Sequence, residues 1–175
     1  MRSRLGPLLL LLLAVACART TLKSSVAAEH GGTDEFAELD FWEGISQARL
    51  VTNRDALHAL LLSVEQAPGG ADYAAEVQQA RKRGWVREGW NRPANETAQT
   101  GLIARAICLE YDIEGGVTMR VLGPRPRYAV RQLTWLGLLP TRGTKEALSG
   151  LELIALLSNV EDFATADDTK PEDLE

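Results

Sequence analysis

The stretch that decides the fold is TNRDALHAL, residues 52–60. Thr52 has a side-chain hydroxyl that can cap a helix N-terminus, and Asp55, three residues later, supplies the acidic partner of a capping box. Apolar residues follow four, seven and eight positions after Thr52. This spacing places them on one face of a helix, so the stretch predicts an amphipathic helix that buries an apolar stripe.

The same apolar spacing occurs twice more in the chain. When Gln99 and Ser149 are aligned with Thr52, apolar residues again fall four, seven and eight positions later, and the three starts lie 47 and 50 residues apart. The nine aligned residues are Ala56, Ala59, Leu60, Ile103, Ala106, Ile107, Leu153, Leu156 and Leu157. Three such helices need neighbours to cover their stripes, so we expect them to pack together around a common axis.

A second helix is predicted before each of these three. In each case a glycine followed by an apolar residue stands at its end, and the glycines are Gly44, Gly84 and Gly137. We expect them to be left-handed C-caps, where glycine avoids the steric cost of a side chain. Between the second and third units, glycines and prolines at 115–116 and 123–127 interrupt helices, and the apolar, β-branched residues 117–122 predict a short extended segment.

The repeated order of helix, glycine, loop and capped amphipathic helix resembles the S-layer homology (SLH) repeat, over roughly residues 36–163. Residues 52–56 and 149–153 match the opening of its second helix, whereas residues 99–103 keep the apolar spacing and lose the acidic residue. The resemblance implies a mostly α fold, with three helix-loop-helix repeats in a pseudo-threefold bundle whose grooves bind cell-wall polysaccharide. Arg54 corresponds to the arginine of the motif, and the other two openings have none.

The N-terminus has the features of a secretory signal peptide. Arg2 and Arg4 precede an apolar run at 8–13 that is too short to span a bilayer, and we interpret residues 1–16 as a signal peptide. Leu13-Ala14-Val15-Ala16-Cys17 resembles the lipobox of bacterial lipoproteins, which implies lipidation at Cys17; an ordinary secreted protein is the alternative. Ala18 in place of aspartate favours the outer membrane, with the protein facing the periplasm or the cell surface.

Composition sets the domain boundaries. Residues 17–33 show no hydrophobic periodicity and predict a flexible, lipid-anchored stalk, residues 34–164 predict one folded domain, and residues 165–175 predict a disordered acidic tail. The net charge is −5, and it becomes −7 when the two signal-peptide arginines are removed. This charge argues against nucleic acid as a partner.

Candidate ligand residues follow from the chemistry of sugar binding, which uses aromatic faces beside charged and amide groups. The candidates in the second unit are Arg87, Trp90 and Asn91. Those in the local basic region between the second and third units are Arg120, Arg125 and Arg127, for which solvated surface arginines are the alternative. Trp85, which follows a helix-ending glycine, is predicted to lie in the core, and Trp42 and Trp135 are predicted to pack against it.

Catalytic patterns are sparse. His30 lies in the predicted stalk and His58 on the predicted polar face of its helix, and neither has partners at metal-ligand spacing, so no metal or cofactor is expected. Cys108 lies among apolar residues and predicts a core position more than a nucleophile. The acidic cluster at Glu110, Asp112 and Glu114 could bind calcium or act as paired carboxylates, but a solvated helix end is the simpler interpretation.

The sequence therefore predicts a protein that is not an enzyme. We expect a lipid-anchored envelope protein that binds peptidoglycan or another wall or surface polysaccharide. A helical scaffold that binds an envelope protein is the alternative from a different class. A third candidate function is that of a polysaccharide-acting enzyme that uses the acidic cluster.

Overall fold

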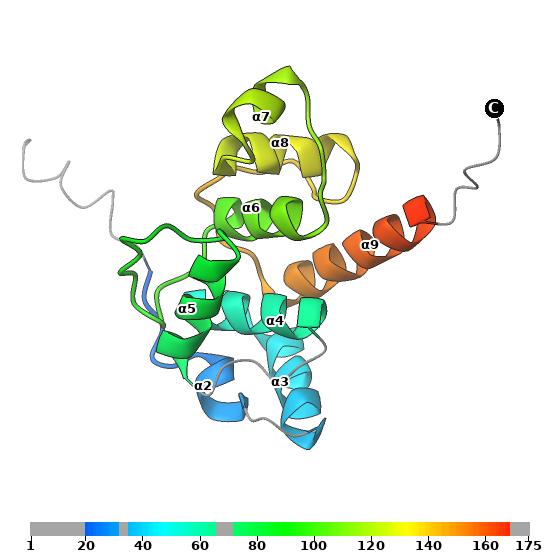
Figure 1. Ribbon diagram of the computed structural model, residues 1–175. Coiled ribbons are helices and arrows are strands. Elements are labelled where there is room, and N and C mark those ends of the chain that lie inside the picture. Colours follow the sequence, from blue (N-terminus) through cyan, green and yellow to red (C-terminus); the bar gives the residue numbers. More distant parts are fainter. Residues whose placement is uncertain (1–19, 32–34, 66–71, 169–175) are drawn as a thin grey trace, which may run out of the picture.

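The computed structural model describes residues 20–31, 35–65 and 72–168, which form eight α-helices. They are α2 (Val26–His30), α3 (Glu35–Gln47), α4 (Asn53–Glu65), α5 (Tyr73–Lys82), α6 (Thr100–Glu110), α7 (Val117–Leu122), α8 (Pro126–Trp135) and α9 (Gly150–Asp168). β-Structure within these ranges is limited to two isolated bridges, Thr21 with Glu96 and Thr52 with Thr97. The prediction of a mostly α fold is confirmed (Figure 1).

Helices α4, α6 and α9 carry the centre of the core. All nine residues of the predicted stripes are buried, and they belong to one hydrophobic cluster. Helix α4 packs against both α6 and α9, while α8 covers another side of α6 (Figure 1). The stripes were predictable because the 3.6-residue period alone decides which side chains share a helix face.

The starts of α4 and α9 carry the predicted capping boxes. Asp55 Oδ2 accepts a hydrogen bond from Thr52 N at 3.0 Å, and Thr52 Oγ1 accepts one from Asp55 N at 3.2 Å. At α9, Glu152 Oε2 accepts from Ser149 N at 2.8 Å, and Ser149 Oγ accepts from Glu152 N at 3.4 Å. Each pair satisfies backbone donors that a helix start otherwise leaves unpaired.

Backbone hydrogen bonds join the segments that precede the three helices. Ala98 N donates to Val51 O, and Val51 N donates to Leu148 O, both at 2.9 Å. Thr100 N, at the start of α6, donates to Glu146 O at 2.8 Å. The side chains of Val51, Ala98 and Leu148 are fully buried. Helices α4, α6 and α9 therefore begin next to one another in the interior.

Two of the three glycines predicted to end helices do so. Gly84 and Gly137 have φ angles of 74° and 77°, the left-handed region that favours glycine. The prediction for Gly44 was wrong, because this residue lies inside α3, which continues to Gln47. A Cβ atom on Gly44 would lie 2.6 Å from Cγ1 of Val26 in α2, so the glycine permits close packing of these two helices.

Residues 20–31 pack onto the domain, contrary to the flexible stalk predicted for this segment. Thr97 N donates to Thr20 O at 3.0 Å, and Ala27, which is buried, donates its backbone N–H to Asp55 Oδ1 at 2.8 Å. The folded part therefore includes Thr20 and does not begin at residue 34. Composition could not show this, because the hydrogen-bond partners lie far along the chain.

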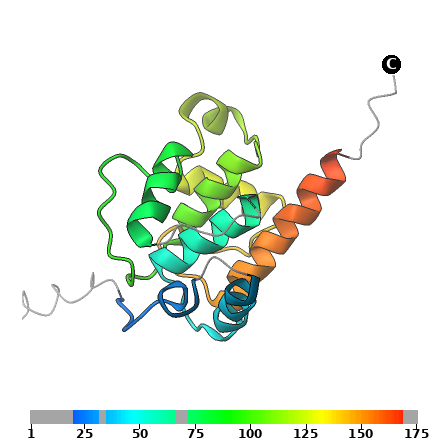
Figure 2. The ribbon, with the colours of Figure 1, turned by 60° about the horizontal axis from the view of Figure 1, so that its bottom comes forward.

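The predicted C-terminal boundary was also wrong. Helix α9 continues past Ala164 to Asp168, into the segment predicted to be a disordered tail. Its last turns project away from the rest of the domain (Figure 2). Along this end of α9 the acidic residues Glu161 and Asp162 are exposed to solvent. The helix therefore continues without burying acidic side chains. Residues 169–175 lie outside the described part of the chain.

Residues 117–122 form helix α7 and not the predicted extended segment. Gly116 O accepts hydrogen bonds from Met119 N at 2.8 Å and from Arg120 N at 3.2 Å. Gly123, with a φ angle of 73°, ends the helix. The β-preference of valine was misleading because it reflects packing within a sheet, and no neighbouring strand is present here.

Three aromatic predictions have mixed outcomes. Trp85 is buried as predicted, and Trp42 is half-buried beside Phe41. Trp135, however, is exposed over 78% of its surface and does not pack into the core.

His58 also differs from its prediction, because it is buried, with Nδ1 3.0 Å from Glu76 Oε1. Helix α5 covers the face of α4 that carries His58, and helical periodicity alone does not predict this cover.

Candidate functional site

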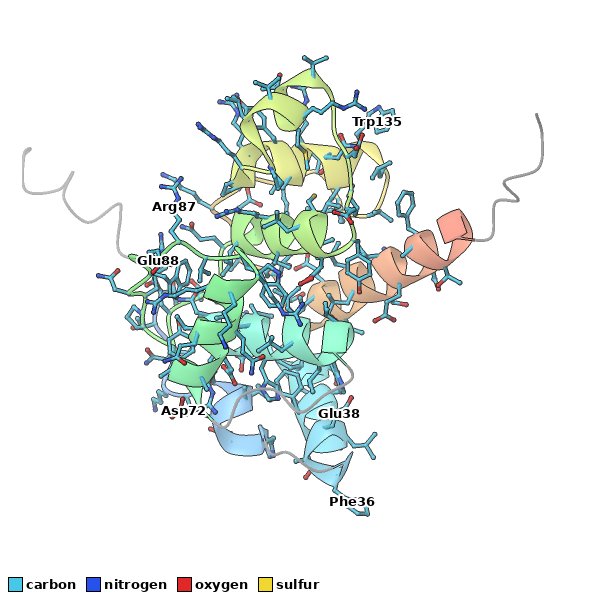
Figure 3. All side chains as sticks on the ribbon, viewed as in Figure 1. Phe36, Glu38, Asp72, Arg87, Glu88 and Trp135 are labelled. Atoms are coloured by element: carbon cyan, nitrogen blue, oxygen red, sulfur yellow. The ribbon has the colours of Figure 1, made fainter. Side chains whose placement is uncertain are left out.

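A groove lies between the loop after α5, the start of α6 and the start of α8. Its volume is about 460 Å³. It is lined by Asn53, Trp85, Val86, Arg87, Gly89, Trp90, Asn91, Arg92, Gln99, Leu102, Arg105 and Pro126. We call it the arginine groove, because three arginines and no carboxylate occur among these described residues. Arg87 points outward at its edge (Figure 3).

The first part of the loop is anchored by two buried side chains. Gly84 turns the chain at the end of α5, and Trp85 N and Val86 N both donate to Ala80 O, at 2.9 and 3.4 Å. The side chains of Trp85 and Val86 then enter the core. This anchoring fixes the direction in which the following residues leave the helix.

A chain of hydrogen bonds positions Trp90. Its indole Nε1 donates to the Tyr73 hydroxyl at 3.1 Å, and this hydroxyl donates to Arg92 O at 2.9 Å. Arg81 Nη2 donates to Trp90 O at 2.9 Å. Burial raises the pKa of Tyr73, so its hydroxyl remains a donor near neutral pH. Trp90 therefore has a fixed, half-buried position on the groove wall.

Arg87 and Arg105 give the groove its positive charge. Burial lowers the pKa of Arg105, and the nearby charge of Arg87 lowers it further. The third arginine, Arg92, pairs with Glu96 at 3.0 Å, and its guanidinium lies 5.4 Å from the centre of the Trp90 ring. An anion between Arg87 and Arg105 would relieve their mutual repulsion and accept charge-assisted hydrogen bonds.

Carboxamides supply the remaining polar groups of the groove. Asn53 Nδ2 donates to Pro93 O at 2.9 Å, which ties the start of α4 to the loop. Asn91 is exposed, and Gln99 makes no cap hydrogen bond with its side chain at the start of α6. An amide can both donate and accept, so Asn91 and Gln99 suit the hydroxyl groups of a sugar.

The structure divides the predicted ligand residues among different places. Those of the second unit line the arginine groove together, namely Arg87, Trp90 and Asn91. Those of the basic region between the second and third units are exposed on α7 and at the start of α8, namely Arg120, Arg125 and Arg127. Cys17 lies outside the described residues.

Arg54 lies at neither place. Its Nε atom is 3.7 Å from Oε1 of Glu76, a fully buried carboxylate of α5 that also contacts His58. Burial raises the pKa of Glu76, and the charges of His58 and Arg54 act in the opposite direction. The arginine that matches the SLH motif therefore belongs to the contact between α4 and α5 and does not line the groove.

Three further residues line the groove that were not predicted from the sequence, namely Arg105, Arg92 and Gln99. A signal for Arg105 was present, because it is the single charged residue between Gly101 and Leu109 in an otherwise apolar helix. A charge in such a helix is expected to reach solvent or a partner. Whether Arg105 lies near Arg87 depends on how the loop after α5 folds back over α6.

The predicted acidic cluster is divided among separate contacts. Glu110 pairs with Arg83, Glu114 pairs with Arg120 at 2.8 Å, and Asp112 is exposed with a φ angle of 45°. Within residues 20–31, 35–65 and 72–168, no group of three or more His, Cys, Asp or Glu side chains is arranged to hold a metal ion.

Cys108 is expected to be unreactive in the folded protein. It is buried on α6, and burial raises the pKa of its thiol to about 12, so the nucleophilic thiolate is scarce near neutral pH. In residues 18–175, where Cys108 is the one cysteine, native protein treated with Ellman's reagent at pH 8 should therefore label at least ~100-fold more slowly than protein unfolded in guanidinium. Equal labelling rates for the folded and unfolded protein would contradict this assignment.

No described helix combines the length and apolar character needed to cross a bilayer. Comparisons of the chain with protein-family models, with curated proteins and with solved structures found no match.

Proposed function

We propose that this protein is a lipid-anchored envelope protein that binds peptidoglycan or another wall or surface polysaccharide without catalysis. The observation that carries the proposal is the arginine groove. It combines two tryptophans, three arginines and three carboxamides with no lining carboxylate, in a chain of net charge −5. A positive groove in an acidic protein favours an anionic ligand.

The groove chemistry suits an acidic glycan. Trp90, which lines the groove, offers an apolar surface for a sugar ring, while Asn91 and Gln99 offer groups that pair with hydroxyls. Arg87 and Arg105 offer guanidinium donors for carboxylate or phosphate groups along the polymer.

The arrangement of helices supports the further proposal of three SLH-like repeats in a pseudo-threefold bundle. In sequence, the repeats would consist of α3 and α4, α5 and α6, and α8 and α9. In space, α3 packs on α9, α5 on α4 and α8 on α6. Support comes from the burial of all nine aligned stripe residues and from the hydrogen bonds that join Val51 to Ala98 and to Leu148. In this arrangement ten of the twelve residues that line the arginine groove belong to the second repeat, with Asn53 from the first and Pro126 from the third. The groove would then lie where the second repeat meets its neighbours, as the inter-repeat grooves of that family do.

Lipidation at Cys17 would hold the domain close to the membrane. Cys17 precedes Thr20 by three residues, which span at most about 10 Å when extended. Thr20 is already hydrogen-bonded to Thr97. A protein with this anchor would therefore have its wall-binding groove near the lipid surface, without the long stalk expected from composition.

Binding of residues 18–175 to purified wall sacculi tests the proposal, because this segment keeps every contact described above without signal peptide or lipid. Arg87→Ala should reduce retention about tenfold, since a charge-assisted hydrogen bond contributes about 1.5–3 kcal/mol. Asn91→Ala should reduce it by a smaller factor. Both side chains are exposed, so the fold should persist, as circular dichroism can verify.

Arg49→Ala is the matched control, because it removes an exposed arginine that does not line the groove. Its retention should equal that of the unchanged protein. If Arg87→Ala and Arg49→Ala were retained equally, the groove would be rejected as the binding site. If the unchanged protein stayed in the supernatant, polymer binding would be rejected.

A scaffold role is the second candidate, favoured by the outward-facing Phe36 and Leu39 on α3, which are exposed over 79% and 63% of their surfaces. A protein partner would cover such residues. Failure of sacculus binding, together with loss of a defined envelope complex in a Phe36→Ser variant, would favour this role over polymer binding.

A further inference from the structure

Helices α7 and α8 form a projecting basic and apolar surface that shares only Pro126 with the lining of the arginine groove. In Figure 1, α7 lies at the outer end of the molecule, beyond α8, which packs on α6. We call the exposed part of this region, residues 117–135, the α7–α8 tip. Large apolar side chains of the tip face solvent, namely Val117, Val121, Leu122 and Trp135.

The apolar exposure of α7 follows from its helical form. Val117 and Val121 are one helical turn apart and are exposed over 80% and 76% of their surfaces, whereas Met119 faces inward and is buried. Hence α7 uses one residue to attach to the domain and presents its valines outward. Trp135, at the end of α8, is also directed away from the core (Figure 3).

The charge of the tip is opposite to that of the protein. Between Gly115 and Lys145 the sequence contains no Asp or Glu, although the whole chain has a net charge of −5. Four exposed arginines lie on the tip, namely Arg120, Arg125, Arg127 and Arg131. Arg120 pairs with Glu114 at 2.8 Å, but both side chains are more than 70% exposed, so this pair is readily exchanged for another anion.

A hollow between α7 and α8 is lined by both the basic and the apolar side chains of the tip. Its volume is about 590 Å³, and Arg120, Arg131 and Trp135 line it, together with Met119, Tyr128 and Glu114. Gln132 Nε2 donates to Glu114 O at 3.0 Å, which ties α8 to the segment that precedes α7. Guanidinium groups beside an indole and aliphatic side chains match the boundary between lipid phosphates and acyl chains.

We propose that the α7–α8 tip binds the surface of a membrane that contains anionic phospholipid. Val117, Val121 and Leu122 enter the outer acyl region, Trp135 lies at the headgroup level, and the arginines pair with lipid phosphates. Charge complementarity selects this occupant, because four exposed arginines in a stretch that contains no Asp or Glu suit a continuous anionic sheet. A soluble glycan would leave the exposed aliphatic side chains of the tip in water, whereas a membrane would bury them. The combination of arginines and aliphatic side chains therefore favours lipid over polymer.

Co-sedimentation of residues 18–175 with vesicles tests the proposal without any contribution from a lipid anchor. Vesicles of phosphatidylglycerol mixed with phosphatidylcholine should bind the protein, and vesicles of phosphatidylcholine alone should bind it at least about tenfold more weakly. Arg127→Glu should reduce the partition coefficient by about fivefold or more, since each basic residue near an anionic surface contributes about 1 kcal/mol. Raised ionic strength should weaken binding in the same direction.

The apolar contribution is tested by Val117→Asp combined with Val121→Asp, which should reduce binding at least about tenfold. Leu39→Asp on α3 makes the same kind of change at an exposed apolar site away from the tip and should leave binding unchanged. A second measurement needs no change in the tip valines. The blue shift of tryptophan fluorescence on vesicle addition should be present in the unchanged protein and largely absent in Trp135→Phe.

Equal binding to neutral and anionic vesicles, or no binding to either, would overturn the proposal. Unchanged binding by the double valine variant would also overturn it. So would loss of sacculus retention in Arg127→Glu with vesicle binding intact, because the tip would then be a polymer site. Arg87→Ala should leave vesicle binding unchanged, so the result for the tip is independent of the result for the arginine groove.

Discussion

Gly150→Ala is expected to destabilise the domain by more than about 3 kcal/mol, a large part of the roughly 5–15 kcal/mol that stabilises a typical domain. A Cβ atom at Gly150 would lie 1.6 Å from Ile45 O and 2.7 Å from Ile45 C. These are backbone atoms of α3 and cannot move aside as a side chain can. Gly150 N also donates to Ala48 O at 2.8 Å, so moving the start of α9 away would break this bond.

Thermal unfolding followed by circular dichroism measures the effect, and the midpoint should fall by about 10 °C or more. Gly89→Ala is the control, because a Cβ atom there has no atom within 4 Å and its φ angle is not positive. That variant should unfold within about 2 °C of the unchanged protein. A Gly150→Ala midpoint equally close to the unchanged value would show that α3 and α9 do not approach as described.

Asp55→Ala is expected to cost about 3–5 kcal/mol and to release α2 from the domain. The buried Asp55 carboxylate accepts from Thr52 N at 3.0 Å, from Thr52 Oγ1 at 2.6 Å and from Ala27 N at 2.8 Å. Alanine would remove the N-cap partner of α4 and leave two backbone N–H groups buried without an acceptor. Each such group costs about 1–3 kcal/mol.

Chemical denaturation gives the loss of stability, and faster hydrogen exchange of the Ala27 amide would show the release of α2. Glu152→Ala is the matched control, because Glu152 holds the equivalent place in the capping box of α9 but its side chain is 40% exposed. Water can replace it, so that variant should lose only about 1 kcal/mol. Equal losses in the two variants would contradict the role assigned to the burial of Asp55.

Both of these sites bear on the arginine groove. Helices α4, α6 and α9 begin next to one another, and Asn53 and Gln99 line the groove at the starts of α4 and α6. A change that loosens this junction should therefore weaken polymer retention as well as stability. Arg87→Ala, in contrast, should weaken retention alone, because the side chain is exposed on the loop.

The part of the candidate site that could be predicted is local in sequence. Arg87, Trp90 and Asn91 lie within one loop, so composition was enough to group them. The groove also needs Arg105 from α6 and Pro126 from α8, which approach the loop only in the folded chain. Arg54 shows the opposite case, since a motif match suggested a ligand residue and the fold gave it a buried carboxylate as its neighbour.

The sequence alone determined the three amphipathic helices, their buried stripes and the capping boxes of α4 and α9. These features depend on helical periodicity and on hydrogen bonds between residues three apart, so no distant contact is needed to infer them. Tertiary structure decided that residues 20–31 join the domain, that 117–122 are helical, that His58 is buried and that Trp135 is exposed. Each of these depends on whether a distant segment covers a given face, and a local pattern contains no information about such a neighbour.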